Sequence, residues 1–224
     1  MLSVIVPTLD EAPVIAATLA AARASPSAEL LVVDGGSRDE TVRIARSLAD
    51  RVLAAPRGRA AQMNAGAAAA AGDVLLFVHA DTRLPHGYAD AIAAALSDPA
   101  VLSGRFDLCL DAPGVAYRAL ERAISLRSRL TGVATGDQAM FVRRAAFERV
   151  GGFPLLPLME DVALARILKR AGGVACLRDI VLTSARRWQR RGLVRTVLLM
   201  WALRLAYYAG VSPARLARAY ADAR

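Results

Sequence analysis

Carboxylates stand at three places where this chain could carry out chemistry. Asp34 ends one apolar run, Asp81 follows another within His79-Ala80-Asp81, and the pair Glu160-Asp161 precedes a helical pattern. A carboxylate accepts hydrogen bonds from a base or ribose, holds a hard cation, or removes a proton from a substrate. The three places therefore suggest one carboxylate for a nucleotide, one for a metal and one for a general base.

The elements that must position these residues alternate between strand and helix. The predicted strands of the first half are residues 3–7, 30–33, 52–54 and 73–78, with helices between them and over residues 59–71 and 86–96; Asp10 is the expected N-cap of the first helix. This order predicts an α/β fold with a mostly parallel sheet and helices on both faces. In such sheets ligands bind beyond the carboxyl ends of the strands, which is where Asp34 and Asp81 fall.

The second half predicts additional, mixed strands. Strands are expected over residues 101–110, 136–142 and 174–183. Helices are expected over residues 115–130, from residue 144, and over residues 160–171, 193–209 and 213–224. We expect this half to build the acceptor side of a site whose nucleotide side lies in the first half.

The loops after the first two predicted strands do not match known phosphate-binding motifs. Neither a GxGxxG nor a GxxxxGK[ST] motif is present, which disfavours a dinucleotide site and a P-loop. Asp34 and Ser37 have an alternative role in forming the turn and capping a helix. Asp81 has a comparable alternative as part of an Asp-Thr turn before Pro85, and Glu160 and Asp161 as favourable helix-starting residues.

Five motifs, taken in order, resemble family 2 glycosyltransferases. They are Val-Pro-Thr-Leu-Asp-Glu from residue 6, Val-Val-Asp-Gly-Gly-Ser-Arg-Asp-Glu-Thr from residue 32, His-Ala-Asp-Thr from residue 79, Phe-Val-Arg-Arg-Ala-Ala-Phe-Glu-Arg-Val-Gly-Gly-Phe from residue 141, and Glu-Asp at 160–161. The resemblance runs from residue 3 to about 188 and is greatest to a small bacterial subgroup. It implies a GT-A fold and transfer of a sugar from a nucleotide-diphospho-sugar with inversion at the anomeric carbon.

The resemblance also assigns roles to matching residues. The positions implied to bind the nucleotide, with Asp34 on the base, are Pro7, Thr8, Glu11, Asp34, Ser37, Asp39 and Arg59. Asp81 matches the last carboxylate of a metal-binding DxD motif, so Mg²⁺ or Mn²⁺ is the expected cofactor. His79 stands where the first aspartate of that motif is usual, and histidine suits softer metals. Asp161 matches the general base, and Glu160 would hydrogen-bond the acceptor or modulate Asp161 by like-charge repulsion.

The acceptor is implied to bind near Asp137 and Gln138 and near the segment Arg186-Arg187-Trp188, which resembles the end of a QxxRW motif. The arginines of this segment would clamp a diphosphate and Trp188 would stack on a sugar; the alternative is a basic turn before the terminal helix. The glutamine of QxxRW is absent, and Asp10 stands where asparagine is usual. Because no multi-span membrane region follows, processive polymer synthesis is not expected.

The composition fits one sizeable, arginine-rich domain. Hydrophobic residues make up 55% of the 224 residues, and lysine plus arginine exceed acids by 29 to 20, giving a net charge of +9. Arginines cluster late, at residues 186–195, where they would meet phosphates, anionic lipid or nucleic acid, or form a solvated basic face. Cys109 and Cys176 have no metal-binding spacing, and no signal peptide precedes the first strand, so a cytoplasmic protein is expected.

The apolar segment over residues 193–211 is open to two interpretations. Arg195 and Arg204 lie nine residues apart, on opposite sides of an ideal helix, which favours a packing helix over a simple interfacial one. The alternative is a peripheral contact at the inner face of a membrane. We expect a GT-A domain over residues 1–188, with a nucleotide-binding half (1–100) and an acceptor half (101–188), and a C-terminal helical extension over residues 189–224.

Two other functions fit the composition less well. A sugar nucleotidyltransferase would need a glycine-rich, lysine-containing loop near its N-terminus, and residues 3–13 contain neither glycine nor lysine. A non-enzymatic basic module would bind a membrane surface or nucleic acid through the late arginines. The acids at strand ends argue against nucleic acid as the main ligand.

Overall fold

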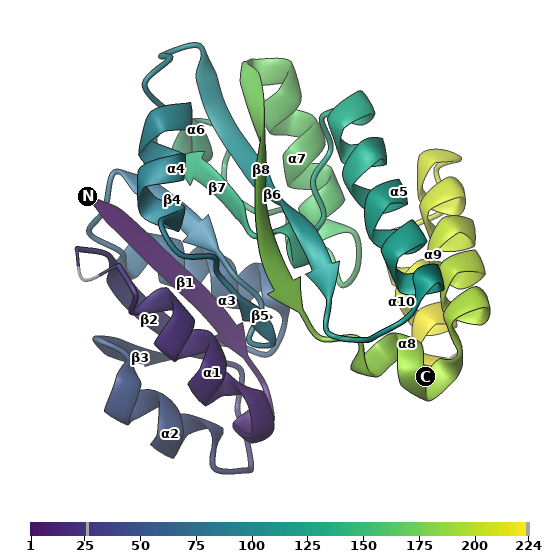
Figure 1. The fold of residues 1–224 in the computed structure, drawn as a ribbon, viewed down its shortest axis with the longest axis horizontal. Helices are drawn as coiled ribbons and strands as arrows, with labels where there is room; N and C mark the ends of the chain where they lie inside the picture. Colours follow the sequence, from purple (N-terminus) through teal and green to yellow (C-terminus); the bar gives the residue numbers. More distant parts are fainter. Residues whose placement is uncertain (26, 223–224) are drawn as a thin grey trace.

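An eight-stranded sheet forms the centre of the protein, in the order β3-β2-β1-β4-β7-β6-β8-β5 (Figure 1). The computed structural model describes residues 1–25 and 27–222. The strands are β1 (Leu2–Thr8), β2 (Glu29–Asp34), β3 (Arg51–Ala54), β4 (Val74–Phe77), β5 (Thr82–Arg83), β6 (Val101–Leu110), β7 (Met140–Arg143) and β8 (Gly173–Thr183). Only β5 and β7 run antiparallel to their neighbours in this sheet. The predicted mixed, mostly parallel sheet is confirmed.

Helices cover both faces of the sheet, because successive residues of a strand point to opposite sides. Val4 and Val6 of β1 belong to a core that includes α1 and α4, whereas Ile5 belongs to a second core with α3, α6 and α7. The helices are α1 (Ala12–Ala22), α2 (Thr41–Leu48), α3 (Arg59–Ala69), α4 (Tyr88–Ala95), α5 (Val115–Thr131), α6 (Arg144–Arg149), α7 (Glu160–Ala171), α8 (Arg186–Arg191), α9 (Leu193–Tyr208) and α10 (Pro213–Asp222). The expected flanking helices are therefore present.

The strand directions bring several loops to one edge of the sheet. Thr8 at the end of β1 pairs with Asp34 at the end of β2, and Asp34 pairs with Ala54 of β3. β7 runs the other way, so the chain that enters β7 reaches this edge from the opposite direction. That entering chain includes a short 3-10 helix, Gly136–Gln138. Residues from distant parts of the sequence thus meet at this carboxyl edge.

Three local features differ from the sequence expectation. Residues 136–142 were expected to be strand throughout, but they begin with the 3-10 helix and β7 starts only at Met140. The short elements β5 and α8 were not anticipated. Helix α1 begins at Ala12 rather than directly after Asp10, and no side chain at its N-cap position supplies a hydrogen bond. Residues 223–224 of the expected terminal helix lie outside the described residues.

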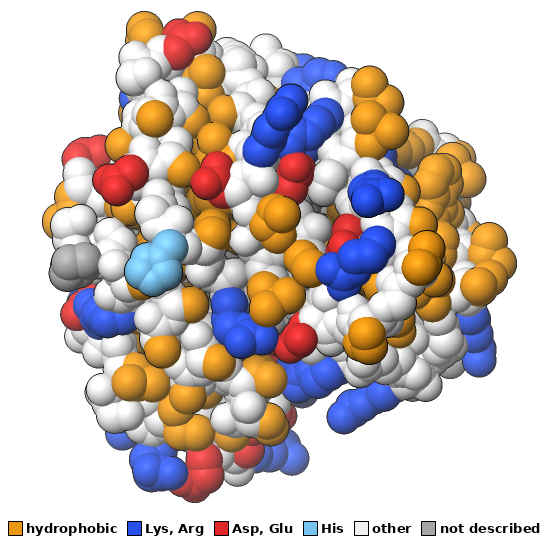
Figure 2. All heavy atoms as spheres, in the orientation of Figure 1, with side chains coloured by type: hydrophobic (Ala, Val, Ile, Leu, Met, Phe, Trp, Pro, Cys, Tyr) orange, Lys and Arg blue, Asp and Glu red, His pale blue; other side chains and the backbone are white. Residues whose placement is uncertain are grey.

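The C-terminal helices add a wall beside the sheet. Leu203 of α9 and Leu216 of α10 are buried in the core that contains α3 and α7. The opposite side of α9 is apolar yet exposed, and Figure 2 shows hydrophobic side chains gathered over this helix; the large ones are Val194, Leu198, Trp201, Leu205 and Tyr208. Within the described part of the chain, no helix is both long enough and apolar enough to cross a bilayer.

Candidate active site

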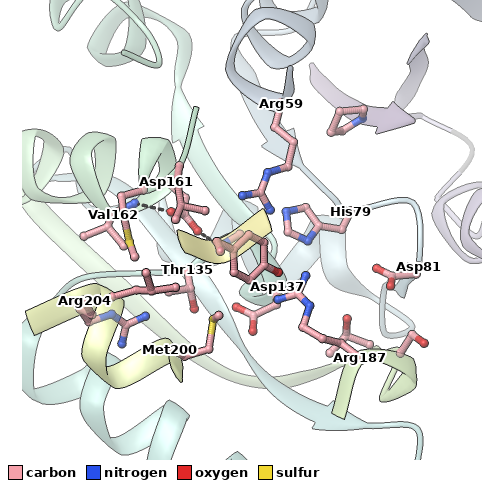
Figure 3. A pocket seen from close by; sticks show the side chains of 18 of the residues that line it. Arg59, His79, Asp81, Thr135, Asp137, Asp161, Val162, Arg187, Met200 and Arg204 are labelled. Atoms are coloured by element: carbon pink, nitrogen blue, oxygen red, sulfur yellow. Dashed lines mark hydrogen bonds between the residues drawn. The ribbon is translucent and has the colours of Figure 1, made fainter. Parts of the chain in front are cut away.

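A cavity of about 610 Å³ opens at the carboxyl edge of the sheet. Its lining comes from the loops after β1, β3 and β4, the start of α7, and the helices α5, α8, α9 and α10. Figure 3 shows the side chains converging on this space. Most residues singled out in the sequence line it, namely Pro7, Thr8, Glu11, Arg59, His79, Asp81, Asp137, Asp161, Arg187 and Trp188. The remainder, Asp34, Ser37, Asp39, Gln138 and Glu160, do not.

Asp161 is the carboxylate that the backbone holds most firmly at the cavity. Its Oδ2 accepts a hydrogen bond from the N–H of Gly136 (2.7 Å) and its Oδ1 from the N–H of Val162 (2.7 Å). The residue lies in the first turn of α7, two residues after Met159, which adopts a left-handed conformation (φ 69°). A carboxylate fixed in this way has one orientation toward the cavity, as Figure 3 shows.

Glu160 faces the protein interior instead of the cavity. Its side chain is only 2% exposed, and Oε1 forms an ion pair with Nε of Arg59 at 2.8 Å. Among the described residues, no hydrogen-bond donor reaches its buried Oε2. Burial raises the pKa of Glu160, while Arg59 lowers it and Asp161 raises it further. The position therefore suits Glu160 to hold Arg59 rather than to contact a ligand directly.

Arg59 carries its charge to the cavity wall from the start of α3. Burial lowers the pKa of Arg59, but Glu160 and then Asp161 more than offset this, so the pKa is raised overall. Gly58 precedes the helix with φ 139°, a conformation that disfavours any side chain. The guanidinium is thus a permanent cation, anchored on one side by Glu160 and directed to the cavity on the other.

His79 and Gly136 are in close contact at the floor of the cavity. A Cβ added at Gly136 would lie 2.4 Å from Nε2 of His79 and 3.4 Å from Oδ2 of Asp161. Burial, followed by the charge of Arg59, lowers the pKa of His79, although Asp81, Asp137 and Asp161 oppose the shift. The imidazole is therefore neutral at pH 7, and the turn beside it requires glycine.

Asp81 and Glu11 share one arginine that comes from α8. Nη2 of Arg186 lies 2.7 Å from Oε2 of Glu11 and 3.4 Å from Oδ2 of Asp81. Burial raises the pKa of Glu11 against the effect of Arg186, and the hydrogen bond to Glu11 raises the pKa of Arg186. In the sequence, Arg186 belonged to the basic segment that resembles the end of a QxxRW motif, where a diphosphate was the expected partner. Its role in joining two strand-end loops needs the tertiary structure.

The loop after β2 uses its polar side chains to fix the loop after β1. Asp34 accepts hydrogen bonds from the N–H groups of Gly36 and Ser37 and from the Ser37 hydroxyl. Ser37 Oγ in turn accepts from the N–H of Asp10 (2.9 Å), and Asp39 accepts from the N–H of Ala12 (3.1 Å). Thus Asp39, from the neighbouring loop, binds the first N–H of α1.

Asp137 and Gln138 separate into a cavity residue and a structural one. Gln138 is fully buried, and its amide donates to Oγ of Ser128 (3.0 Å) and to the carbonyl of Phe106 (3.4 Å). It also forms a capping box with Thr135. Asp137 lines the cavity, and no donor among the described residues reaches its buried Oδ1. An unpartnered buried oxygen of this kind calls for a ligand or water.

Several cavity residues were not identified from the sequence. Arg127 from α5, Arg204 from α9 and Tyr220 from α10 line the side away from the strand-end loops. One signal was available, because Arg204 interrupts an apolar helix on the side opposite Arg195. The structure agrees with that spacing, since Arg195 is exposed and Arg204 lines the cavity.

Comparison with known proteins identifies the family. The family described as Glycosyl transferase family 2 matches residues 3–151, about two thirds of the chain. The chain belongs to glycosyl transferase family 2. No curated protein matches this sequence.

Solved structures show that this family 2 domain has a GT-A-like fold. TarS from S. aureus (residues 1–349) matches with a TM-score of 0.68 at 20% identity, covering 82% of this chain and 60% of that one. Mannosyltransferase PcManGT from Pyrobaculum calidifontis, in complex with GDP-Man and Mn²⁺, gives 0.65 at 24%, covering 92% and 60%. Glucosyl-3-phosphoglycerate synthase from Mycobacterium tuberculosis gives 0.58 at 19%, covering 80% and 70%. This chain thus spans about 60% of the first two.

The oxygen and nitrogen donors of this family 2 domain fit a divalent cation that arrives with a diphosphate. Within the described residues, no three His, Cys, Asp or Glu side chains are grouped to hold a metal ion by themselves. The carboxylate of Asp81 nevertheless faces the cavity, with neutral His79 two residues before it. Mg²⁺ is typically held by one or two carboxylates together with substrate phosphates, and Asp81 is a carboxylate in a position to serve in such a set.

Proposed function

We propose that this protein transfers a sugar from a nucleotide-diphospho-sugar to an acceptor hydroxyl, with inversion at the anomeric carbon. The observation that supports this most strongly is the position of Asp161, whose two oxygens are fixed by backbone N–H groups at a cavity that the strand-end loops also line. In a single displacement one base suffices, and no covalent nucleophile is needed. We assign that base to Asp161.

The residues divide the reaction between them. Asp161 accepts the proton of the acceptor hydroxyl while the oxygen of that hydroxyl attacks the anomeric carbon. The bond between the anomeric carbon and the diphosphate oxygen breaks, and its electron pair leaves with the nucleoside diphosphate. Glu160 keeps Arg59 oriented toward the cavity. Asp81 would hold Mg²⁺ or Mn²⁺ together with the diphosphate, and that cation would neutralise charge on the leaving group.

The donor is proposed to occupy the side lined by Pro7, Thr8, Glu11 and Arg59. Two of the similar structures contain nucleotide sugars, UDP-GlcNAc with TarS and GDP-Man with PcManGT, which supports this class of donor. We propose that Asp34, Ser37 and Asp39 act chiefly by holding the loop after β1 in place, since their side chains bond within the two loops. The predicted contact between Asp34 and a base remains a prediction.

The acceptor is proposed to lie on the other side, near Asp137, Arg187 and Trp188. We propose that residues 1–100 form the donor half, that residues 101–188 form the acceptor half, and that residues 189–224 form a helical extension. We also propose that the protein works in the cytoplasm at the inner face of a membrane. The exposed apolar side of α9, together with the exposed Arg190 and Arg195, complements an anionic bilayer.

Thermal unfolding with nucleotides tests the proposed donor. The purified protein is heated with UDP, GDP, CMP and their sugar conjugates, with and without Mn²⁺. A ligand that binds only the folded state, at about a hundred times its Kd, adds roughly 2.7 kcal/mol of stability. We expect one nucleoside diphosphate to give a shift that needs the metal. A folded protein that responds to none of these ligands would contradict the proposed function.

A further inference from the structure

The half of the cavity that faces away from the strand-end loops contains two arginines with few partners. Arg127 comes from α5 and Arg204 from α9, and Figure 3 shows Arg204 directed into the same space as Asp137 and Asp161. Within the described residues, no carboxylate lies within ion-pair distance of either guanidinium. Among the described residues, Arg127 donates to the carbonyl of Val133 (3.2 Å) and to Oγ1 of Thr135 (3.5 Å) alone.

The two cations oppose each other. Burial, followed by the charge of Arg204, lowers the pKa of Arg127 to about 10, with Asp137 and Asp161 acting in the other direction. Among the described residues, no acceptor reaches the buried Nε of Arg204. An arginine whose pKa is about 10 is still charged at neutral pH, so Arg127 adds to this part of the cavity a positive charge that the protein only partly balances. An anion placed between them would supply the missing acceptor and relieve the repulsion.

The wall beside these arginines is apolar and leads outward. Leu120, Ile124, Val197, Met200 and Trp201 line the cavity between α5 and α9. Trp201 is 59% exposed, so it lies at the mouth, and the exposed side of α9 continues from it through Leu198 and Leu205. A purely ionic ligand would gain nothing from this wall. A ligand with an apolar chain would bury it there.

We propose that Arg127 and Arg204 bind an oxyanion, a phosphate or carboxylate, on an acceptor that also carries an apolar chain. The chain lies between α5 and α9 and the acceptor hydroxyl faces Asp161. That this ligand is the acceptor rests on the proposed glycosyl transfer. The binding of an anionic amphiphile to this half of the cavity does not, because none of the donor-side residues takes part.

Intrinsic fluorescence provides a direct readout of this site. The chain contains two tryptophans, Trp188 and Trp201, and both line the cavity. The full chain is titrated with octyl phosphate below its micellar concentration, with inorganic phosphate and with 1-octanol. We expect octyl phosphate to change the emission and to bind at least about tenfold more tightly than either of the others, since each contributes only one of the two interactions.

Arginine variants then assign the anion. Arg127→Gln and Arg204→Gln should each weaken octyl phosphate binding about tenfold or more, the usual scale for a lost hydrogen bond to a charged group. Arg122→Gln is the matched control, since Arg122 lies on the same helix α5, is exposed and does not line the cavity. Thermal unfolding verifies that each variant is folded, and Arg204→Lys, which keeps the charge, should retain more affinity than Arg204→Gln.

Three results would overturn the proposal. They are equal binding of inorganic phosphate and octyl phosphate, equal binding of 1-octanol and octyl phosphate, or unchanged affinity in both Arg→Gln variants. The nucleotide titrations give an independent outcome. If octyl phosphate binds through the arginines but no nucleotide stabilises the protein, the anionic site stands and the glycosyl transfer fails; the reverse pattern removes the anionic site alone.

Discussion

The two sides of the cavity hold their polar groups differently. On the donor side, Asp34, Ser37 and Asp39 bond to backbone and side-chain groups of two neighbouring loops, so the loops are held before any ligand arrives. Oγ1 of Thr8 is the exception there, since it is buried without a partner among the described residues. On the acceptor side, Asp137 and Arg204 each keep a buried polar atom without a partner in the described structure. The protein itself therefore organises the donor-side loops, whereas the acceptor side keeps an acceptor and a donor atom available to a ligand.

The largest effect should come from Asp161, which lies where the two sides meet. Asp161→Asn removes the proposed base, and we expect turnover to fall by about a thousandfold, while the nucleotide-induced stabilisation stays the same. Release of nucleoside diphosphate from a nucleotide sugar measures the first effect and thermal unfolding the second. Asp179→Asn, at an exposed position that does not line the cavity, is the control. Normal turnover in Asp161→Asn would show that the chemistry lies elsewhere.

Gly136→Ala tests whether the close contact between Gly136 and the side chain of His79 is rigid. Its new Cβ would lie 2.4 Å from Nε2 of His79, so we expect a loss of about 1–3 kcal/mol in the free energy of unfolding. Since Gly136 also donates to Asp161, turnover should fall as well. Urea unfolding gives the stability. Adding His79→Ala should recover part of the loss, and a double variant no more stable than Gly136→Ala would argue against this clash.

Vesicle binding tests whether the exposed apolar side of α9 contacts a membrane. Leu198→Asp and Leu205→Asp place a charge on the exposed apolar side of this helix. Each variant should co-sediment several-fold less with vesicles that contain anionic lipid. The new carboxylate reduces the apolar area that the bilayer can bury, and it opposes the attraction between anionic lipid and the nearby arginines. Leu155→Asp, at a residue 75% exposed outside α9, should have no effect. Equal losses in all three would remove α9 as the specific contact.

The smallest effect concerns the pH dependence of His79. Its pKa is lowered by burial and by Arg59, so the imidazole should titrate in NMR below the ordinary value of about 6.5. His86, the other histidine, is exposed and gives a resonance for comparison. Because the pKa of His79 is lower in the folded state than in the unfolded state, the neutral imidazole contributes to the free energy of unfolding. This contribution is fully present above the unfolded pKa and declines as the pH falls below it. A His79 midpoint above 6.5 would contradict the buried environment.

The sequence predicted best the features whose signals are local. Asp34 and Ser37 form the turn that was the alternative to nucleotide contact, and the boundaries of β6 and α7 follow from local periodicity and start signals. The two residues of β5 form a strand only because Thr82 and Arg83 pair with Thr183 and Leu182 of β8. No local pattern contains that information.

The acceptor side was harder to predict because its members are scattered. Arg127 and Arg204 belong to different helices, and only the fold brings them to one cavity. Glu160 shows a second difficulty, since it is adjacent to Asp161 in the sequence but points the other way, into the core. A one-residue step along a helix turns a side chain by about 100°. The resemblance pointed to Asp161 as the base, but the sequence left open whether Glu160 also contacts the acceptor.

Arg186 would make metal binding at Asp81 a competition between two cations. Its guanidinium already pairs with both Glu11 and Asp81, so a single positive charge is shared between two carboxylates. A metal ion held by Asp81 in the proposed reaction would compete with Arg186 for the same carboxylate. The guanidinium that it displaced would belong to α8, which also carries Arg187 and Trp188 at the cavity wall. Filling the donor side would in that case change the charge beside the acceptor side.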